Sequence, residues 1–430
     1  MMKTIKYPKR NKWPELLTRP EFERNQFTNV VSEILSEVKL KGDTALFDFT
    51  EKFDKSTLSS LVASENEINE AIQLVPEDLK KAIDIAKHNI EKFHTSQNTQ
   101  EPIIETTKGV KCWRKNVAIE KVGLYIPGGT APLFSTILML AIPAKIAGCK
   151  EVVLCTPPDK NGNINPAILY TASLVGVTKI FKVGGAQAIA AMAYGTETIP
   201  QVYKIFGPGN QFVAKAKELV QQEGIAIDLP AGPSEVLIIA DKTSNPSFVA
   251  ADLLSQAEHG ADSQVILLSN DENVIVEVNK ELKVQLAQLP RMEFAVKALE
   301  NSQSILLKNM GDCIDFSNQY APEHLIIASK NPTMYIDQII NAGSVFLGNY
   351  SCESAGDYAS GTNHTLPTNG YAKNYSGVSF DSFVKKITFQ KLNKEGIKNI
   401  GPAIELMAEA EQLFAHKNAV TLRLKEIQDV

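Results

Sequence analysis

The fold class is indicated by residues 122–155, which read VGLYIPGGTAPLFSTILMLAIPAKIAGCKEVVLC. An apolar run at 122–126 leads through a Gly-rich turn into an apolar helical segment at 135–147, and a second apolar run follows at 152–155. Strands that are apolar on both faces and alternate with helices are typical of parallel βαβ units. This stretch therefore predicts an α/β protein built on a parallel sheet.

The same alternation continues toward the C-terminus. Further strands are predicted at 180–183, 202–205, 236–240, 265–268, 305–307, 325–327 and 344–347, with helices between most of them. Before this region, residues 27–53 and 76–93 carry apolar side chains at helical spacing, and the tail is helical again from residue 402. The sequence thus predicts two α/β lobes with helical extensions at both ends.

These patterns divide the chain into five parts. We expect an N-terminal arm over 1–20, a helical segment over 21–110 packed partly on the second lobe, a first lobe over 111–235, a second lobe over 236–380, and a mainly helical C-terminal tail over 381–430. Residues 348–380 are rich in Gly, Ser, Asn and Tyr and show little periodicity. A segment of this length inside a compact protein is usually functional.

Composition narrows the class of protein. With 430 residues, 44% of them hydrophobic, the chain can form two or more cores. Its formal charge is −5, and the dispersed Lys and Arg residues form no basic block for nucleic acid. The longest apolar run, 134–144, is too short to span a bilayer, and the N-terminus lacks the apolar stretch of a signal peptide. We therefore expect a cytoplasmic protein without nucleic-acid or membrane partners.

The cysteines give no sign of a disulfide framework or a Cys-rich zinc site. Their number, five, is odd, and no Cys-x-x-Cys spacing occurs. Cys149 and Cys155 flank an apolar run and are expected to be small core residues. Nothing in the sequence near them would lower a thiol pKa, as a nucleophile requires.

Four of the six histidines lie in unusually polar sequences: His259, His324, His364 and His416. Imidazole, carboxylate and amide groups on separate loops and helix ends can assemble into one site. Zinc takes about four N, O or S ligands, and His and Glu suit proton transfer at neutral pH. This scatter is typical of a metal-assisted enzyme.

Gln256 and His259 lie three residues apart near the end of a helix predicted over 246–258, and Gly260 follows them. Their side chains point from one face of that helix and could bind a metal together. In isolation, an interfacial His beside a polar group is the commoner arrangement.

Glu323 and His324 precede the strand predicted at 325–327. Adjacent side chains of an extended segment point to opposite sides, so only a bend at Pro322 would bring both into one cavity. There they could serve two proton transfers, one by the imidazole and one by the carboxylate acting on water. A solvated strand start is the simpler account of the pair.

The remaining polar candidates lie nearer the C-terminus. Asp357 and His364 fall within 348–380, where ordered polar residues commonly bind ligands. Glu411 and His416 are five residues apart, on partly different faces of a predicted helix, and in isolation they would be solvated.

Gly-rich turns at 127–130, 184–185 and 207–209 could each place backbone amides near a phosphate. None of them fits Gly-x-Gly-x-x-Gly, the dinucleotide-binding motif. Such turns are also structural necessities between strands and helices, so spacing alone leaves both explanations open.

Longer motifs along the chain resemble the histidinol dehydrogenase family. They are YIPGGT at 125–130, VGGAQ at 183–187, FGPGN at 206–210, LPAGPSE at 229–235, LSQAEHG at 254–260, APEH at 321–324, ESAGDYASGTNH at 353–364 and AHKNAV at 415–420. The similarity covers the chain from about residue 20 onward. Eight long motifs in the same order are far more specific than any pair of residues above.

The resemblance implies the roles of the polar residues. Gln256, His259, Asp357 and His416 look like zinc ligands, with His416 supplied by the partner subunit of an intertwined homodimer. Glu323 and His324 look like the catalytic pair. The groups that look like contacts to NAD are Tyr125, Gln187 and Asn210. The groups that look like contacts to the substrate are Ser234, Gln256, His259, His324, Asp357, His364, Glu411 and His416.

The resemblance also implies a fold and a reaction. The fold is two Rossmann-like parallel-sheet lobes, with NAD on the first lobe, the metal on the second, and the C-terminal tail reaching the partner subunit. The reaction is two successive NAD-dependent oxidations, of L-histidinol to L-histidinaldehyde and then to L-histidine, the last step of histidine biosynthesis. His324 would remove the hydroxyl proton, and Glu323 would activate water.

Three other functions stay open at this point. The first is a related zinc- and NAD-dependent dehydrogenase of another amino or sulfonated alcohol, although Glu411 and His416 favour histidinol. The second is a zinc hydrolase in which Glu323 activates water without a redox step, and NADH formation would exclude it. The third is a catalytically silent, zinc-stabilised binding protein, which an activity assay would distinguish.

Overall fold

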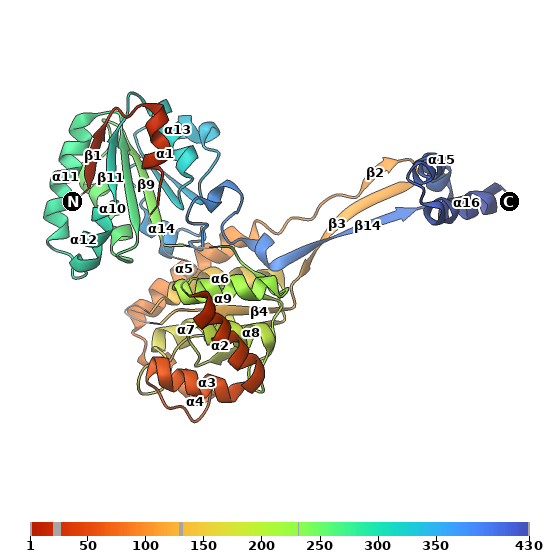
Figure 1. Cartoon of the computed structure of the whole chain (residues 1–430), viewed down its shortest axis with the longest axis horizontal. Helices are drawn as coiled ribbons and strands as arrows, with labels where there is room; N and C mark the ends of the chain where they lie inside the picture. Colours follow the sequence, from red (N-terminus) through yellow and green to blue (C-terminus); the bar gives the residue numbers. More distant parts are fainter. Residues whose placement is uncertain (1, 20–26, 129–131, 231, 429–430) are drawn as a thin grey trace.

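The computed structural model describes residues 2–19, 27–128, 132–230 and 232–428. These residues form two α/β lobes and an arm that extends away from both lobes (Figure 1). Each lobe is built on a parallel sheet, so the predicted fold class is confirmed. Among the described helices, none is long and apolar enough to cross a membrane.

The first lobe contains a five-stranded parallel sheet in the order β6-β5-β4-β7-β8. Its strands are β4 (Lys121–Tyr125), β5 (Glu151–Cys155), β6 (Lys179–Phe181), β7 (Lys204–Phe206) and β8 (Ala226–Ile227). They alternate with α6 (Phe134–Ala147), α7 (Pro166–Val175), α8 (Gly185–Tyr194) and α9 (Gln211–Gln222). The strand order reverses between β4 and β7, and open α/β sheets bind ligands at such a reversal.

Helices cover both faces of this sheet, which is why its strands are apolar after their first residue. In β5, Val152 and Leu154 pack with residues of α6 and α7, whereas Val153 and Cys155 pack with residues of α8 and α9. Cys155 is fully buried and Cys149 is half-buried against the α6–α7 side. Both cysteines therefore lie at core positions.

The helical segment before the first lobe packs on that lobe. It consists of α2 (Thr28–Lys41), α3 (Asp43–Phe49), the π-helical turn η2 (Thr50–Asp54), α4 (Glu65–Leu74) and α5 (Glu77–Thr95). α2 packs on α8, α4 on α7, and α5 on α6, so each amphipathic helix buries its apolar face on the nearest helix of the sheet. α5 also reaches the segment 348–380, where Asn89 Nδ2 donates to the Ala359 carbonyl (2.8 Å).

The second lobe contains a six-stranded parallel sheet in the order β1-β11-β10-β9-β12-β13. Its strands are β1 (Lys3–Lys6), β9 (Glu235–Ala240), β10 (Gln264–Ser269), β11 (Gln303–Leu306), β12 (His324–Ala328) and β13 (Ser344–Leu347). Its helices are α10 (Pro246–Ala257), α11 (Glu272–Leu286), α12 (Met292–Glu300), α13 (Met310–Tyr320) and α14 (Glu353–Tyr358). α14 is a short helix within the segment 348–380.

The N-terminal residues differ from the irregular arm expected at 1–20. β1 pairs in parallel with β11, with Lys3 opposite Gln303, and therefore forms the edge of the second sheet. α1 (Trp13–Leu16) follows, and Trp13 is buried against Phe316 of α13 at a ring distance of 5.3 Å. β1 was missed because it has only four mostly exposed residues and lacks the apolar run that marks a buried strand.

The arm is a three-stranded antiparallel sheet that ends in two helices (Figure 1). It contains β2 (Ile104–Thr107), β3 (Val110–Ala118), β14 (Val384–Leu392), α15 (Lys394–Ala410) and α16 (Phe414–Gln428). All nine residues of β14 pair with β3. The expected tail over 381–430 is therefore part strand. Its strand was missed because both of its faces are largely exposed and carry charged side chains, which hides the alternation of a half-buried strand.

Candidate active site

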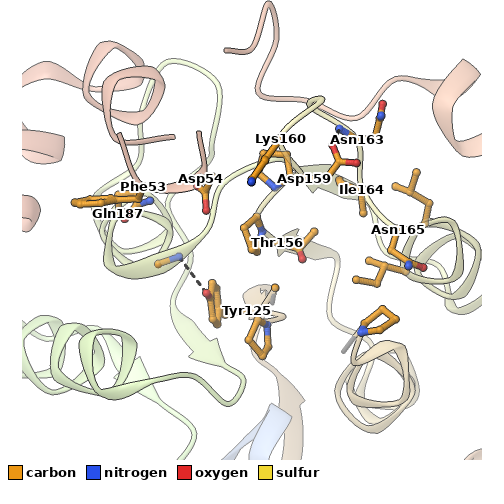
Figure 2. Close-up of a pocket in the computed structure, with 18 of the residues that line it drawn as sticks. Phe53, Asp54, Tyr125, Thr156, Asp159, Lys160, Asn163, Ile164, Asn165 and Gln187 are labelled. Carbon is orange, nitrogen blue, oxygen red and sulfur yellow. Dashed lines mark hydrogen bonds between the residues drawn. The ribbon is translucent and has the colours of Figure 1, made fainter. Parts of the chain in front are cut away.

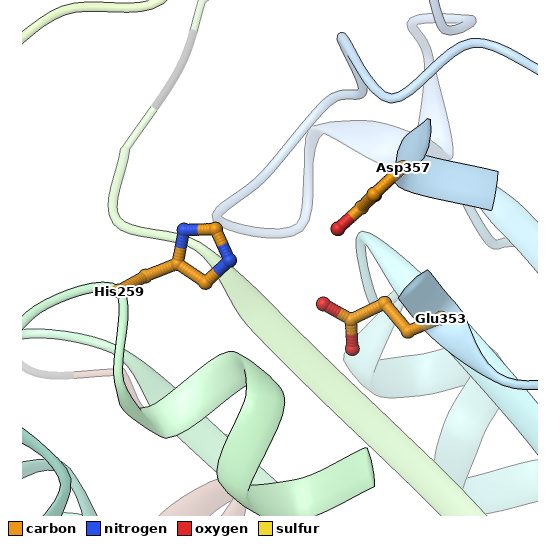
Figure 3. A group of neighbouring side chains, drawn as sticks. All are labelled: His259, Glu353 and Asp357. Carbon is orange, nitrogen blue, oxygen red and sulfur yellow. The ribbon is translucent and has the colours of Figure 1, made fainter. Parts of the chain in front are cut away.

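One imidazole and two carboxylates converge beside α10. His259 lies just after the end of α10, and Glu353 and Asp357 lie four residues apart on α14, so both point from one helix face. One ligand atom from each residue lies within 4.8 Å of the other two (Figure 3). Imidazole nitrogen and carboxylate oxygen are zinc donors. The structure thus brings the predicted ligands His259 and Asp357 together.

Gln256, another predicted ligand, lies against the same group. It is buried on α10. When its amide is oriented so that both the nitrogen and the oxygen have hydrogen-bond partners, Nε2 donates to Glu353 Oε1 and Oε1 accepts from the Glu235 N–H (2.8 Å). Among the described residues, Glu353 Oε2 has no hydrogen-bond partner, although the side chain is buried. A buried acceptor without a partner costs free energy, and a cation bound beside Glu353 would lower that cost. The donor set therefore fits a zinc ion.

Glu323 and His324 lie beside each other, with Glu323 Oε2 and His324 Nδ1 3.6 Å apart. The chain bends just before them, because Ala321 ends α13 in the left-handed conformation (φ 55°). At Gly343 a side chain would meet the Glu323 carbonyl oxygen at 2.6 Å, so the neighbouring strand can approach this bend only at a glycine. Both side chains are buried, and they lie next to each other.

The backbone of Glu235, the first residue of β9, contacts both of these side chains. The Glu235 N–H, which is shared with Gln256 Oε1, also donates to Glu323 Oε2 (2.9 Å), and His324 Nδ1 lies 3.3 Å from the Glu235 carbonyl oxygen. Because only a protonated Nδ1 can donate to a carbonyl, this contact assigns the proton to Nδ1. His324 Nε2 then faces Asp357 Oδ1 at 3.6 Å, which is too long for a hydrogen bond.

The site carries an excess of negative charge. Burial lowers the pKa of His324, but the carboxylates of Glu353, Glu323 and Asp357 outweigh it and raise that pKa well above its usual range. Burial raises the pKa of Asp357, but the neighbouring histidines lower it to a net value below the usual range. Burial also raises the pKa of Glu353 well above its usual range. The buried carboxyl groups of Glu323 and Glu353 and the partly buried one of Asp357 favour a cation here.

Two further predicted residues border the site. Ser234 immediately precedes Glu235 at the start of β9. His364 Nδ1 lies 2.8 Å from the Asp357 carbonyl oxygen, and its Nε2 lies 3.1 Å from Thr136 Oγ1 on α6 of the first lobe. His364 therefore connects the two lobes next to the converging side chains.

A cavity of about 1270 Å³ lies in the first lobe (Figure 2), and its lining does not include His259, Glu353 or Asp357. Tyr125, at the end of β4, and Asn210, after β7, both line it, so it opens at the reversal of strand order. Gln187 of α8 lines it as well. The three predicted NAD contacts thus share one cavity. Its volume exceeds the roughly 300–1,000 Å³ of pockets for drug-sized ligands and is large enough for a dinucleotide.

Two glycines, Gly185 and Gly207, make close backbone contacts with Tyr125. The Gly185 N–H donates to the Tyr125 hydroxyl oxygen (3.0 Å), which is the contact drawn in Figure 2. A Cβ at Gly207 (φ 127°) would clash with the Tyr125 carbonyl oxygen, so this turn requires glycine. Of the predicted Gly-rich turns and motifs, residues 129, 130 and 231 lie outside the described residues.

Asn210 has a structural role in addition to its predicted contact with NAD. Its Oδ1 accepts from the N–H groups of Phe212 (3.0 Å) and Val213 (3.2 Å), and it thereby caps α9. A contact from Asn210 to a ligand would therefore use Nδ2.

Comparison with known proteins places these features in a family. The histidinol dehydrogenase family matches residues 17–424. Histidinol dehydrogenases of Bacteroides thetaiotaomicron (60% identical over 428 residues, 100% of each chain) and Bacteroides fragilis strain YCH46 (61% over 427 residues, 99% of this chain and 100% of that one) are similar to it. The crystal structure of histidinol dehydrogenase from Elizabethkingia anophelis matches with a TM-score of 0.98 at 60% identity, over 99% of each chain.

This chain belongs to the histidinol dehydrogenase family. In this member of the family, two predicted residues lie on the arm rather than at the converging side chains. His416 lies on α16 and Glu411 at the end of α15, and both are exposed at the far end of the arm (Figure 1). Within one chain the structure does not bring them to His259.

Two residues of this histidinol dehydrogenase family member were missed by sequence reasoning. Glu353 lies one helical turn before Asp357, a spacing that would have shown it if 353–358 had been taken as helical instead of loop. Glu235 acts through its backbone N–H and carbonyl, which every residue except proline carries. The sequence therefore contained a signal for Glu353, its spacing from Asp357, and no signal for Glu235.

Proposed function

We propose that this chain catalyses two successive NAD-dependent oxidations, of L-histidinol to L-histidinaldehyde and of the aldehyde to L-histidine, with zinc at the converging side chains. The observation that carries the proposal is the convergence of His259, Asp357, Glu323 and His324 at one site in a member of the histidinol dehydrogenase family. The proposal includes the cytoplasmic location that the sequence led us to expect.

Zinc would be held by Gln256, His259 and Asp357, together with the partner subunit's His416. When bound, zinc is a Lewis acid that orients and polarises a substrate, and NAD is the acceptor of hydride. The buried Glu353 lies beside the ligands and orients Gln256 through the amide contact described above. Such neighbours of metal ligands commonly fix the geometry of the ligands.

NAD would occupy the first-lobe cavity, in contact with Tyr125, Gln187 and Asn210. Its position at the reversal of strand order supports this assignment. His364 connects this lobe to the second through Thr136 and Asp357. It therefore lies where the cofactor and the substrate would meet.

Without a metal, burial lowers the pKa of His324, but the neighbouring carboxylates outweigh burial and raise that pKa. A bound zinc ion would offset their charge, and His324 would then accept the hydroxyl proton at Nε2. Its Nδ1 is held by the Glu235 carbonyl, so Nε2 is the nitrogen that faces the site. Glu323 would accept a proton from the water that hydrates the aldehyde. Its Oε2 is held by the Glu235 N–H, which leaves Oε1 for this water. Ser234, His364 and the partner subunit's Glu411 would bind the substrate, the carboxylate of Glu411 matching the amino group.

The active unit would be a homodimer in which the arm of each chain packs against the other chain. Leu406, Met407, Phe414 and Leu422 on α15 and α16 are 58–69% exposed, an unusual density of exposed apolar side chains on a helix pair. Contact with a second copy would cover them. It would also bring the partner subunit's His416 and Glu411 to this chain's site.

The direct test is turnover of L-histidinol with NAD, followed by NADH absorbance and by the appearance of L-histidine, with and without a chelator. We expect NADH and histidine in a two-to-one ratio, lost when the chelator removes the metal. Oxidation of a sulfonated alcohol but not of histidinol would contradict the substrate assignment. Product formation without NADH would instead indicate a hydrolase.

A further inference from the structure

We propose that Arg19 is a positioning residue that fixes the bend before Glu323 and His324 together with the start of β9, whose backbone contacts both of these residues. Arg19 lies on the N-terminal segment that follows α1, and it contacts neither Glu323 nor His324 in any hydrogen bond or ion pair found among the described residues. It acts through Glu235 and through the turn at 320–321. This inference rests on the proposed function, because it assigns a role to the groups that would perform the proton transfers.

The first contact of Arg19 is with the start of β9. Its Nε donates to Glu235 Oε2 (2.6 Å) and its Nη2 to Glu235 Oε1 (2.9 Å), a bidentate ion pair. The two side chains are only 16% and 3% exposed. Tyr320 adds a third contact, with its hydroxyl 3.0 Å from Glu235 Oε2. The side chain of Glu235 is therefore fixed while its backbone holds both Glu323 and His324.

The second contact of Arg19 is with the bend before Glu323. Nη2 also lies 2.9 Å from the Tyr320 carbonyl oxygen and 3.4 Å from that of Ala321, and the guanidinium lies 3.8 Å from the centre of the Tyr320 ring. Ala321 is the residue in the left-handed conformation, which for a non-glycine side chain costs free energy and must be stabilised by its surroundings. Arg19 supplies that stabilisation at the carbonyl groups.

One guanidinium thus joins the start of β9, whose backbone contacts Glu323 and His324, to the bend that precedes these two residues. Lysine could not replace it, because an ammonium group has no planar fork to bind a carboxylate at two points and stack on a ring at once. A buried ion pair is weak evidence for a stabilising role, since its desolvation offsets its attraction. The Arg19–Glu235 pair lies next to the backbone that contacts Glu323 and His324, so fixing the positions of these two residues explains the pair better than a gain in stability does.

The experiment compares Arg19→Gln, Arg19→Lys and the double variant Arg19→Gln/Glu235→Gln in the zinc-loaded protein. The double variant removes both charges and leaves no unpaired buried carboxylate if the single variant fails to fold. Arg10→Gln is the matched control. Arg10 lies just before α1 and pairs with Asp312 and Asp315 of α13, and it has no contact with the bend among the described residues.

The measured quantities are kcat and KM for histidinol and for histidinaldehyde, and the zinc content. We expect the double variant to keep its zinc and its KM, and kcat to fall about 10²-fold, the effect of a displacement of roughly 1 Å at reacting groups. Arg19→Lys should be intermediate, and Arg10→Gln should match the wild type. A folded, zinc-loaded double variant with wild-type kcat would overturn the inference, as would a rise in KM at constant kcat.

A crystal structure of the double variant separates this inference from the proposed function. We expect the Glu323 carboxylate to leave the Glu235 N–H and the bend at Ala321 to relax. A Glu323 carboxylate still held as in the wild type would overturn the positioning role, whichever substrate the protein uses. Absence of histidinol turnover in the wild type would contradict the proposed function alone.

Discussion

His259 is the only imidazole in the group that also contains Glu353 and Asp357, as far as the described residues show, so it supplies the softest donor to a metal there. We predict that His259→Asn loses most of its bound zinc, because an amide is a weaker donor than imidazole. Elemental analysis of the purified protein measures this. The matched control is His88→Asn on the exposed side of α5, which should keep its zinc. Full zinc occupancy in His259→Asn would refute the ligand assignment.

Glu323→Gln should separate the two oxidations. Glutamine preserves the acceptor for the Glu235 N–H but cannot take a proton from water. We predict that kcat for histidinaldehyde falls by about 10²–10⁴-fold, the usual contribution of a general base, and that kcat for histidinol oxidation to the aldehyde falls much less. Each step is measured with its own substrate. Equal losses in both steps would show that Glu323 does not act on water.

Asp54 in the first-lobe cavity should make stability depend on pH. Burial raises the pKa of Asp54 from 3.8 to about 6. The folded state therefore binds more protons than the unfolded state between these values, so the carboxyl group destabilises the fold increasingly as the pH rises from about 4 to about 6. We predict that Asp54→Asn is more stable than the wild type at about pH 8, by about 1 kcal/mol after discounting for solvent screening, and not at about pH 4.

Urea unfolding of the wild type and of Asp54→Asn without NAD, at both pH values, measures the difference. Asp48→Asn, on an exposed position of α3, is the control and should match the wild type at both. A stability gain of the same size at both pH values would mean that the ionisation of Asp54 is not its source.

At the scale of secondary-structure elements, the exposed apolar side chains of α15 and α16 predict a dimer interface. Leu406 is 69% exposed within one chain. If a second copy covers it, Leu406→Glu places a charge in the interface and should weaken the dimer by at least about 2 kcal/mol, the value of a buried leucine. Analytical ultracentrifugation over a range of concentrations measures the dissociation constant.

Leu40→Glu is the control for that experiment, because Leu40 is 82% exposed on α2, away from the arm. It should leave the dissociation constant unchanged. An unchanged constant in Leu406→Glu as well would place the interface elsewhere.

The secondary-structure elements also show which parts of the fold the sequence could predict and which it could not. β4 and β5 were predictable because helices bury both of their faces, and every position after the first residue is apolar. β3 and β14 were not, because their pairing joins residues far apart in the sequence and their exposed faces carry mixed side chains. The bend at Ala321 likewise depends on contacts from Arg19, which no local pattern near residue 321 records.

At the scale of the whole molecule, the arm separates His416 from the His259 of its own chain. A site shared between two copies can be tested by complementation. A hybrid of one His416→Asn chain and one His259→Asn chain contains one intact site, and random exchange makes half of the dimers hybrids, so we predict recovery of about a quarter of wild-type activity from two inactive variants. Activity is measured after the chains exchange, with exchange verified by differently tagged copies.

Mixing the same variants under conditions that prevent exchange is the control and should give no recovery. If exchange is demonstrated and activity stays absent, each site is complete within one chain, and the partner roles of His416 and Glu411 are wrong.

β1 has a consequence for how copies of this protein behave in a crowded solution. A parallel sheet leaves unpaired amide and carbonyl groups along its outer strand, and these can recruit strands from other molecules into aggregates. Here β1 covers β11, and two of its four residues are the lysines Lys3 and Lys6, both exposed. Exposed charged side chains on an outer strand disfavour the docking of a further strand, so this short N-terminal segment protects the second lobe against edge-to-edge aggregation.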